Sequence, residues 1–298
     1  MNHYKTITAL HQANGYPLPE HPMLSLLTCQ ELTTCSWGGQ KFTTDFYMIS
    51  LKKVKSGTFM YGKTRYDHDN GSMSFVKPRQ VIEISNVELA EKSLVMFIHE
   101  DYLLGHTLHE EIKKYSYFEY ETNEALHLSP AEEKIVWELY DKIGVEYRQN
   151  QDEFSKDIIL THVDSILKYA QRFYKRQFLN RNTLSGTTVS KFHKTISEYF
   201  ETGKIKHHGL PSVNALAGEL NLSARYLSDL LKQETGKTAL EHIHIYLIDE
   251  AKNLLLSSDN TIAETAYQLG FENPPYFSRL FKKEVGVTPN EFRLSVVV

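Results

Sequence analysis

Two stretches near the carboxyl end of this 298-residue chain repeat one another and decide its fold. Residues 217–238 read AGELNLSARYLSDLLKQETGKT, and residues 266–288 read AYQLGFENPPYFSRLFKKEVGVT. In the first copy Ser212 and Ser223 are placed to cap two successive helices. In the second, Thr261 and Glu264 form a capping box, and Asn273 precedes a proline at the first helical position. Each copy therefore predicts a helix-turn-helix unit.

The second helix of each copy has one apolar face and one polar face. The apolar positions recur at i, i+3 and i+4, which predicts burial: they are Leu227, Leu230 and Leu231, then Phe277, Leu280 and Phe281. The outward positions hold side chains suited to reading base edges: Arg225, Ser228, Asp229, Pro275, Ser278 and Arg279. Three lysines suit phosphate contacts: Lys232, Lys282 and Lys283. Arg225 and Asp229 are also spaced to pair with each other on a solvated helix, which is an equal alternative.

A helix predicted from about 239 to 256 joins the two units. Its length of roughly 27 Å is close to one turn of DNA, roughly 34 Å. Such a connector would place two recognition helices in consecutive major grooves of double-stranded DNA.

The region from about 210 to 294 resembles the DNA-binding domain of AraC/XylS-type transcription regulators. The resemblance rests on residues 262–271 (IAETAYQLGF), 276–283 (YFSRLFKK) and 286–289 (GVTP), followed by Phe292 and Arg293. It implies two helix-turn-helix units that bind an asymmetric half-site and contact bases through the outward positions above. Pro274 and Pro275 stand where many members have polar side chains.

The first 128 residues predict short strands: Met23–Thr28, Phe46–Val54, Thr58–Tyr61, Met73–Val76, Val81–Ser85 and Ser93–His99. Lys55-Ser56-Gly57 and Asp67–Gly71 read as turns between them. This pattern is typical of a sandwich or a small barrel. The resemblance implies a cupin-like barrel, so the expected fold is an α+β multidomain chain with a cupin-like small β-barrel and an all-α double helix-turn-helix domain.

Two helices are expected to follow. Ser129, Pro130 and Glu132 form a capping box, and a second helix runs from about 152 to 178. Its apolar stripe comprises Ile159, Val163, Ile166, Ala170 and Phe173, widened by Leu160, Leu167 and Tyr174. The stripe would either pair two chains as a homodimer or pack on its own domain. The polar stretch 180–188 predicts a linker.

The predicted domains are thus a sensor barrel at 1–128, a dimerisation helix pair at 129–179, the linker at 180–188 and a DNA-binding domain at 189–298. Residues 171–206 carry 8 basic and 2 acidic side chains in a chain of net charge -4, which favours an anionic partner. No apolar run reaches about 18 residues, so no membrane span is expected. The absence of a signal-peptide pattern favours the cytoplasm. Cys29 and Cys35 are too few for a disulfide framework.

The sequence favours a transcription regulator with a possible small-molecule effector, and RNA polymerase is a further candidate partner. No catalytic motif is present, and His68, His99, His106 and His109 lack metal-site spacing, so neither an enzyme nor a metal or other cofactor is expected. Two alternatives stay open: a cupin-type enzyme fused to a DNA-binding module, and a regulator controlled by protein partners.

Overall fold

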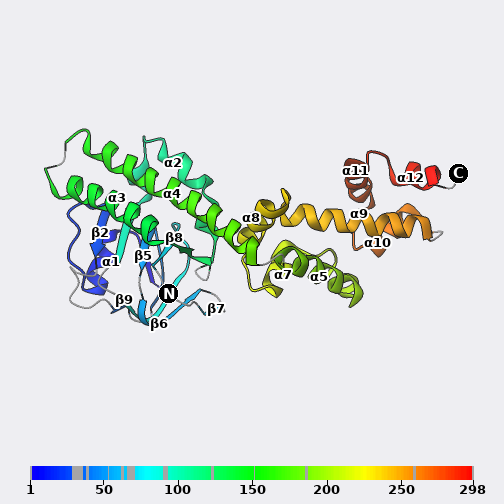
Figure 1. Ribbon diagram of the computed structural model, residues 1–298, viewed down its shortest axis with the longest axis horizontal. Helices are drawn as coiled ribbons and strands as arrows, with labels where there is room; N and C mark the ends of the chain where they lie inside the picture. The colour runs from blue at the N-terminus through cyan, green and yellow to red at the C-terminus, as the bar shows by residue number, and fades with distance from the viewer. Residues whose placement is uncertain are drawn as a thin grey trace. The chain divides into compact units, whose positions relative to one another are not determined.

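The chain divides into two compact units, Met1–Gln177 and Phe178–Val298 (Figure 1). The computed structural model describes residues 2–28, 36–37, 40–52, 54–61, 64–65, 71–89, 93–121, 124–150, 152–184, 187–257 and 260–296. Cys29, Cys35 and the segment Asp67–Asn70 lie outside these ranges. No helix within them is both long and apolar enough to cross a membrane.

The first unit contains two sheets. The six-stranded sheet has the order β1-β4-β9-β6-β7, with β3 also paired to β9; its strands are β1 (Asn2–Tyr4), β3 (Ser36–Trp37), β4 (Gln40–Thr44), β6 (Val54–Tyr61), β7 (Thr64–Arg65) and β9 (Ile82–Leu89). The five-stranded sheet has the order β11-β8-β5-β10-β2; its strands are β2 (Leu24–Thr28), β5 (Phe46–Lys52), β8 (Ser72–Val76), β10 (Leu94–His99) and β11 (Leu126–His127). The β1–β4 pair is parallel.

The expected closed barrel is wrong. Closure needs hydrogen bonds between the edge strands of the two sheets. Within the described residues β11 and β2 end one sheet, and no ladder joins them to the other. The strands instead form two open sheets that enclose an apolar core, which is the sandwich alternative. That core consists of Tyr4, Ile7, Leu10, Leu27, Phe42, Phe46, Met48, Val76, Ile82, Val95 and Phe97.

Two local predictions in this unit are also corrected. Lys55-Ser56-Gly57 is not a turn but part of β6, where the register against β9 shifts twice between Val54 and Thr58. Glycine is common at such bulges because it tolerates the altered backbone. A helix that was not expected, α1 (Ile7–Asn14), follows β1 and buries Ile7 and Leu10.

Helices cover the outer face of the five-stranded sheet. They are η1 (Glu100–Leu103), α2 (Leu108–Glu111), η2 (Ile112–Lys114), η3 (Ser116–Glu119), α3 (Pro130–Arg148) and α4 (Ser155–Leu184). Phe75 of β8 contacts Tyr117 at 4.6 Å between ring centroids, and Tyr117 stacks on Tyr174 of α4 at 5.5 Å. Arg176 of α4 binds Glu132 of α3 through Nε and Nη2, at 3.1 and 2.7 Å.

The predicted capping box of α3 is confirmed, because Ser129 and Glu132 each accept the other's backbone N–H. All eight apolar positions predicted for the stripe of α4 are buried in the chain's own fold. This outcome matches the packing alternative, and a partner chain would need other residues.

The predicted linker is largely helical, because α4 runs to Leu184 and α5 begins at Thr187. A polar, aperiodic sequence therefore continues a helix here, and residues 185–186 lie outside the described ranges. The boundary between the units falls between Gln177 and Phe178, so residues 1–128 and most of 129–179 share one unit.

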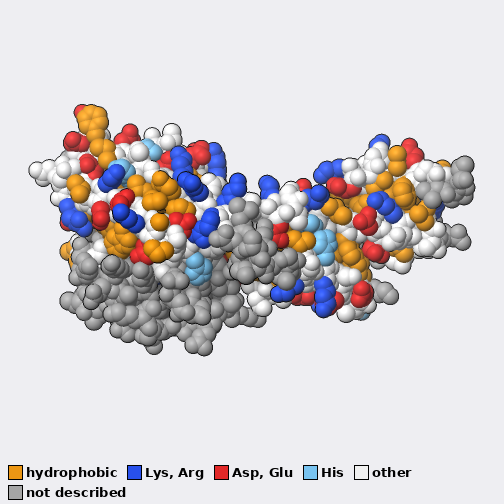
Figure 2. Space-filling model, viewed as in Figure 1, with side chains coloured by type: hydrophobic (Ala, Val, Ile, Leu, Met, Phe, Trp, Pro, Cys, Tyr) orange, Lys and Arg blue, Asp and Glu red, His pale blue; other side chains and the backbone are white. Residues whose placement is uncertain are grey.

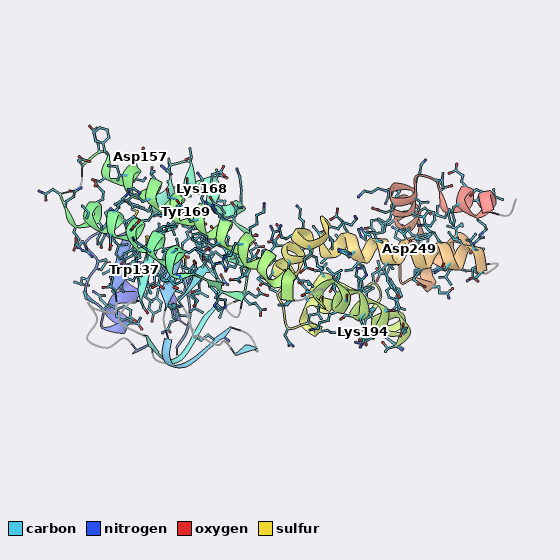
Figure 3. The ribbon with its side chains drawn as sticks, in the orientation of Figure 1. Trp137, Asp157, Lys168, Tyr169, Lys194 and Asp249 are labelled. Carbon is cyan, nitrogen blue, oxygen red and sulfur yellow. The ribbon has the colours of Figure 1, made fainter. Side chains whose placement is uncertain are left out.

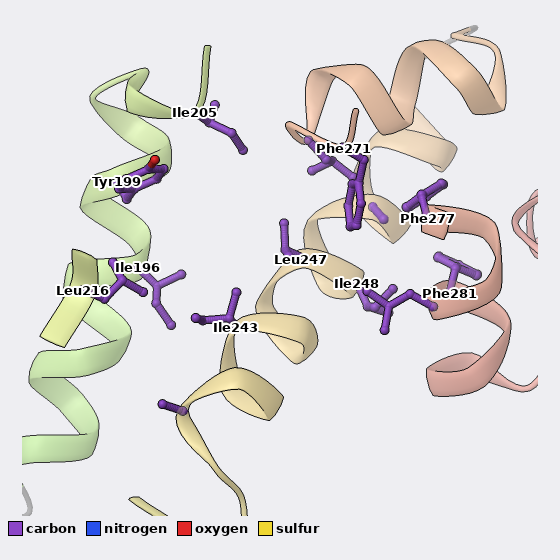
Figure 4. Close-up of a cluster of buried hydrophobic side chains, with 14 of the residues drawn as sticks. Ile196, Tyr199, Ile205, Leu216, Ile243, Leu247, Ile248, Phe271, Phe277 and Phe281 are labelled. Carbon is purple, nitrogen blue, oxygen red and sulfur yellow. The ribbon is translucent and has the colours of Figure 1, made fainter. Parts of the chain in front are cut away.

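The second unit is all helical. Its elements are α5 (Thr187–Glu201), α6 (Lys204–His208), α7 (Val213–Glu219), α8 (Ala224–Thr235), α9 (Ala239–Ser257), α10 (Ile262–Gln268), α11 (Pro274–Val285) and α12 (Pro289–Val296). Its core lies on both sides of α9. Ile243, Leu247 and Ile248 of α9 stand between Ile196 and Leu216 on one side and Phe271, Phe277 and Phe281 on the other (Figure 4).

Candidate nucleic-acid interface

The first helix-turn-helix comprises α7 and α8, as predicted. The hydroxyl of Ser212 accepts the N–H of Ala215, and that of Ser223 accepts the N–H of Tyr226. Asn221 turns the chain with a φ of 55°, a left-handed conformation that asparagine tolerates better than most residues. Leu227, Leu230 and Leu231 are buried as expected. The opposite face of α8 is therefore the one turned to solvent.

The second helix-turn-helix comprises α10 and α11. Thr261 and Glu264 form the predicted capping box, and hydrogen bonds from Thr261 lower the pKa of the Glu264 carboxyl. Gly270 ends α10 with a φ of 82°, and a Cβ there would lie 2.7 Å from Cγ1 of Ile205. Only glycine meets both conditions without strain. Asn273 then caps α11, with Pro274 at its start.

The connector helix α9 packs against both helix-turn-helix units through one continuous apolar core. Its 19 residues match the helix predicted from 239 to 256. Arg293 of α12 donates to the backbone oxygen of Leu255 at 3.2 Å, which satisfies a carbonyl in the last turn of α9, and to that of Asn260 at 2.6 Å, beyond the end of the helix. Both helix-turn-helix units pack on α9 through this core.

On α11 the predicted outward positions do face away from the core. Pro275, Arg279, Lys282 and Lys283 are exposed, and Ser278 is half-buried. The side chain of Arg279 forms no ion pair or hydrogen bond with any residue that the structure describes. Its guanidinium therefore presents all its donors to solvent, where a base edge or a phosphate can accept them.

Tyr276 shares this surface but was not assigned from the sequence. It is 44% exposed and lies one helical turn before Arg279. Tyr276 and Leu280 are both apolar and four residues apart, a spacing that predicts a buried aromatic ring. Tyr276 lies outside the core because it is one residue before the buried Phe277 and so on another face of the helix. Its position adds a flat apolar surface beside the arginine.

On α8 the outward residues are engaged with one another. Nε of Arg225 lies 3.4 Å from Oδ2 of Asp229, and their side chains are 49% and 24% exposed. This is the pairing alternative left open above. Because a surface pair contributes only about 0–1 kcal/mol, it orients both groups without holding them firmly. Lys232 is exposed one turn further on.

Ser228 and Ser278 occupy matching positions but differ in their surroundings. The hydroxyl of Ser228 accepts the backbone N–H of Ala239 at 3.3 Å, at the start of α9. The residue that matches Ala239 in the second copy is Pro289, which has no N–H to donate. The hydroxyl of Ser278 forms no hydrogen bond within the part of the chain that the structure describes. Ser228 is thus tied to the helix scaffold, whereas Ser278 is available to a ligand.

This difference leads to a testable contrast. We expect Ser228→Ala to lower the free energy of unfolding by about 1 kcal/mol, because it leaves an N–H at the start of α9 without its acceptor. We expect Ser278→Ala to change it by less than about 0.5 kcal/mol. Urea denaturation of the full-length chain followed by circular dichroism measures both. Equal effects of the two substitutions would contradict the assignment.

Charge is mixed over this unit. On the face shown in Figure 2, Lys and Arg side chains of the second unit are interspersed with Asp and Glu rather than gathered in one patch. Residues 178–298 carry 13 basic and 13 acidic side chains. Attraction to any duplex irrespective of sequence should therefore be modest, and base contacts carry more of the discrimination.

Known proteins share the region that contains the two helix-turn-helix units. A family described as a helix-turn-helix domain matches residues 216–295, the region that holds α8 to α11 and both turns. The transcriptional activator RhaS of Salmonella arizonae is 37% identical over 79 residues, which cover 26% of this chain and 28% of RhaS. The C-terminal unit holds an AraC-family helix-turn-helix DNA-binding domain.

Other relatives match the same AraC-family domain. The uncharacterized transcriptional regulatory protein YesN of Bacillus subtilis is 40% identical over 76 residues, covering 25% of this chain and 21% of YesN. The solved C-terminal domain of the response regulator yesN from Fusobacterium nucleatum is 30% identical and has a TM-score of 0.30; the match covers 34% of this chain and 96% of that one. The chain spans about a quarter of the length of the curated relatives it matches.

Proposed function

We propose that the protein is a sequence-specific transcription regulator that binds double-stranded DNA through α8 and α11. The observation that carries this proposal is the outward face of α11, where Arg279 and Ser278 have no hydrogen-bond partner among the described residues. Two such helices on one connector suit two consecutive major grooves. Regulation requires neither bond breaking nor a cofactor, so no catalytic role is assigned.

Individual roles follow from side-chain chemistry. Arg279 has the geometry for a bidentate bond to guanine, and Ser278 serves either base type. Pro275 has only carbon atoms to offer and suits contact with a thymine methyl group. In the first helix-turn-helix, Arg225 and Asp229 reach bases once their mutual ion pair opens. Lys232, Lys282 and Lys283 suit phosphates, which set position rather than sequence.

Selection of binding sites from a randomised duplex pool by the full-length chain tests this function. We expect enrichment of a motif with two short blocks about one helical turn apart, roughly 10 base pairs. Lys194→Ala, on an exposed position of α5 that pairs with Glu198, serves as the control and should select the same motif. Failure of the wild-type chain to enrich any sequence would refute the proposal.

Dimerisation is proposed through the end of the α3–α4 pair rather than through the buried stripe. Val145, Phe154 and Ile158 are 65%, 62% and 41% exposed there. The hydroxyl of Ser155 donates to Glu146 at 2.6 Å, which brings the end of α3 beside the start of α4. Exposed apolar side chains clustered in this way are typical of interaction surfaces. Figure 3 shows the two helices with Trp137 on α3 and Lys168 and Tyr169 on α4.

The mass of the chain in solution tests this contact. We expect the double substitution Phe154→Asp and Ile158→Asp to convert a dimer into a monomer, since two charges would be buried without partners. Lys175→Asp changes charge at an exposed position elsewhere on α4 and should leave the mass unchanged. A wild-type chain that sediments as a monomer, or a double variant that stays dimeric, would contradict the proposal.

The first unit is proposed to sense a small-molecule effector, as an AraC-type regulator with a separate β-rich unit would. Because the target is chromosomal DNA, we place the protein in the cytoplasm, with RNA polymerase as the further partner of an activator. A cupin-type enzyme and control by a protein partner are the alternatives, and neither has an observation of its own in the described residues.

A further inference from the structure

The two helix-turn-helix units differ at the turn between their helices. Asn221 stands in the turn of the first, and Gly270 stands at the matching position of the second. Both residues have a left-handed backbone, with φ of 55° and 82°. Asparagine tolerates this conformation better than most residues, so the backbone alone does not explain why position 270 holds a glycine.

The short helix α6 supplies the reason. A Cβ at Gly270 would lie 2.7 Å from Cγ1 and 3.1 Å from Cδ1 of Ile205, well inside the separation of about 3.5–4.0 Å at which carbon atoms pack. Ile205 is 7% exposed, and its side chain points toward Phe271, the residue after Gly270 (Figure 4). Asn221, by contrast, is exposed. The glycine therefore allows α6 to contact the turn of the second helix-turn-helix.

The same short helix contacts the first helix-turn-helix. Nζ of Lys204 donates to Oε1 of Glu219, the last residue of α7, at 2.7 Å. The other end of α6 is held by Tyr199 of α5, whose hydroxyl donates to the backbone oxygen of Gly209 at 3.2 Å. Thus α6 joins the two helix-turn-helix units directly, in addition to their shared packing on α9.

We propose that α6 fixes the spacing between the recognition helices α8 and α11. Helices packed on a common neighbour can slide against it by small shear movements. A second connection that contacts both helix-turn-helix units opposes such movements. The inference rests on the DNA-binding function proposed above, and it assigns Lys204 and Ile205 as positioning residues for that function.

A fixed spacing has a measurable consequence on DNA. One base pair added between two blocks moves the second by about 3.4 Å along the axis and turns it by about 34–36°. Two recognition helices held in one arrangement cannot follow this change, so one of them loses its base contacts. The chain should therefore bind two blocks at one separation and reject separations that differ by a single base pair.

Gel shifts of the full-length chain on duplexes with altered spacing test this role. The duplexes carry the two selected blocks at the selected separation, or with one base pair added or removed between them. We expect the wild type to bind the altered duplexes at least about tenfold more weakly. Ile205→Ala should reduce this ratio severalfold, because alanine leaves a gap beside Gly270. A loss of stability alone would weaken binding to every duplex by the same factor and leave the ratio unchanged.

Two further variants keep the test decisive if Ile205→Ala does not fold. Gly270→Asn gives the second turn the residue of the first, which suits the left-handed backbone, and its Cβ would displace Ile205. Lys204→Ala removes the ion pair at the exposed end of α6. Both variants should reduce the ratio. Lys194→Ala removes a similar ion pair, with Glu198 within α5, and should keep the wild-type ratio.

The outcomes separate this role of α6 from the DNA-binding function. The role would be overturned by a wild-type chain that binds all three separations with similar affinity, or by an equal reduction in Lys194→Ala. A wild-type ratio in Lys204→Ala and in each other variant that folds would overturn it as well. Each of these results leaves sequence-specific binding to the two blocks in place. Failure to select any motif would refute the DNA-binding function itself, and the role of α6 with it.

Discussion

Replacing Phe277 with alanine is expected to lower the free energy of unfolding of the second unit by about 3–5 kcal/mol. Phe277 is fully buried, and its ring lies 5.2 Å from that of Phe271 and 5.9 Å from that of Phe281. Alanine would leave a cavity in the layer that fixes α11 to α9. Phe271 lies in the turn before α11 and Phe281 lies on α11 itself, so closing the cavity would require α11 to move.

Two optical signals separate the units in this experiment. Both tryptophans of the chain, Trp37 and Trp137, belong to the first unit. Tryptophan fluorescence during urea denaturation therefore follows the first unit and should be unchanged in the variant. Circular dichroism at 222 nm includes the all-helical second unit and should show its transition at lower urea.

The neighbouring residue supplies the control. Tyr276 is 44% exposed, so Tyr276→Ala removes an aromatic side chain of similar size from the surface of the same helix. We expect it to lower the free energy of unfolding by less than about 1 kcal/mol. Similar losses in the two variants would mean that the buried and outward faces of α11 have been assigned wrongly.

The second unit could be predicted from sequence because its signals are local. A cap residue and the helix it starts lie within four residues of each other, as Ser223 and Asn273 show. Apolar spacing of three and four residues then identifies the buried face. The repeat adds an internal check, since Leu227, Leu230 and Leu231 and their counterparts are buried in both copies.

The first unit could be predicted only in part because strand pairing is not local. The six predicted strand segments correspond to β2, β5, β6, β8, β9 and β10, whereas β1, β3, β4, β7 and β11 are not predicted. The choice between a closed barrel and an open sandwich depends on which edges meet. Val54 to Tyr61 pairs with β9, some 30 residues further along the chain, and nothing in either segment specifies that register. The sequence around Gly57 predicts a turn rather than a bulge, because glycine is common in both.

The site shows the same limit at the level of single side chains. Helical spacing places Ser228 and Ser278 on outward positions alike, and it cannot show that Ser228 accepts the N–H of Ala239. The sequence does contain a sign of this difference. Pro289 stands where the first copy has Ala239, and a proline has no backbone N–H to donate to Ser278. The Arg225–Asp229 pair was recognisable because it needs only an i, i+4 spacing.

Replacing Arg279 with alanine is expected to weaken binding to the selected DNA site by about 1–3 kcal/mol, or roughly 5- to 150-fold. The free energy of unfolding should be unchanged, because the side chain of Arg279 is exposed and makes no hydrogen bond within the described residues. Affinities for the selected site and for a set of single-base variants, measured by gel shift at one salt concentration, give both the loss and its sequence dependence. A base contact predicts that discrimination relaxes at one position of the site.

Arg225→Ala is the matched comparison, because Arg225 occupies the outward face of α8. Arg225 must leave Asp229 before it can bind a base. The free energy gained from the base contact is therefore partly offset by the free energy lost with the ion pair. We therefore expect a smaller loss of affinity than for Arg279→Ala, and Asp229→Ala should change the affinity less in the Arg225→Ala background than in the wild type. An Arg279→Ala variant that binds every site variant with the same proportional loss would instead assign Arg279 to a phosphate. One that keeps full affinity and discrimination would remove α11 from the reading surface.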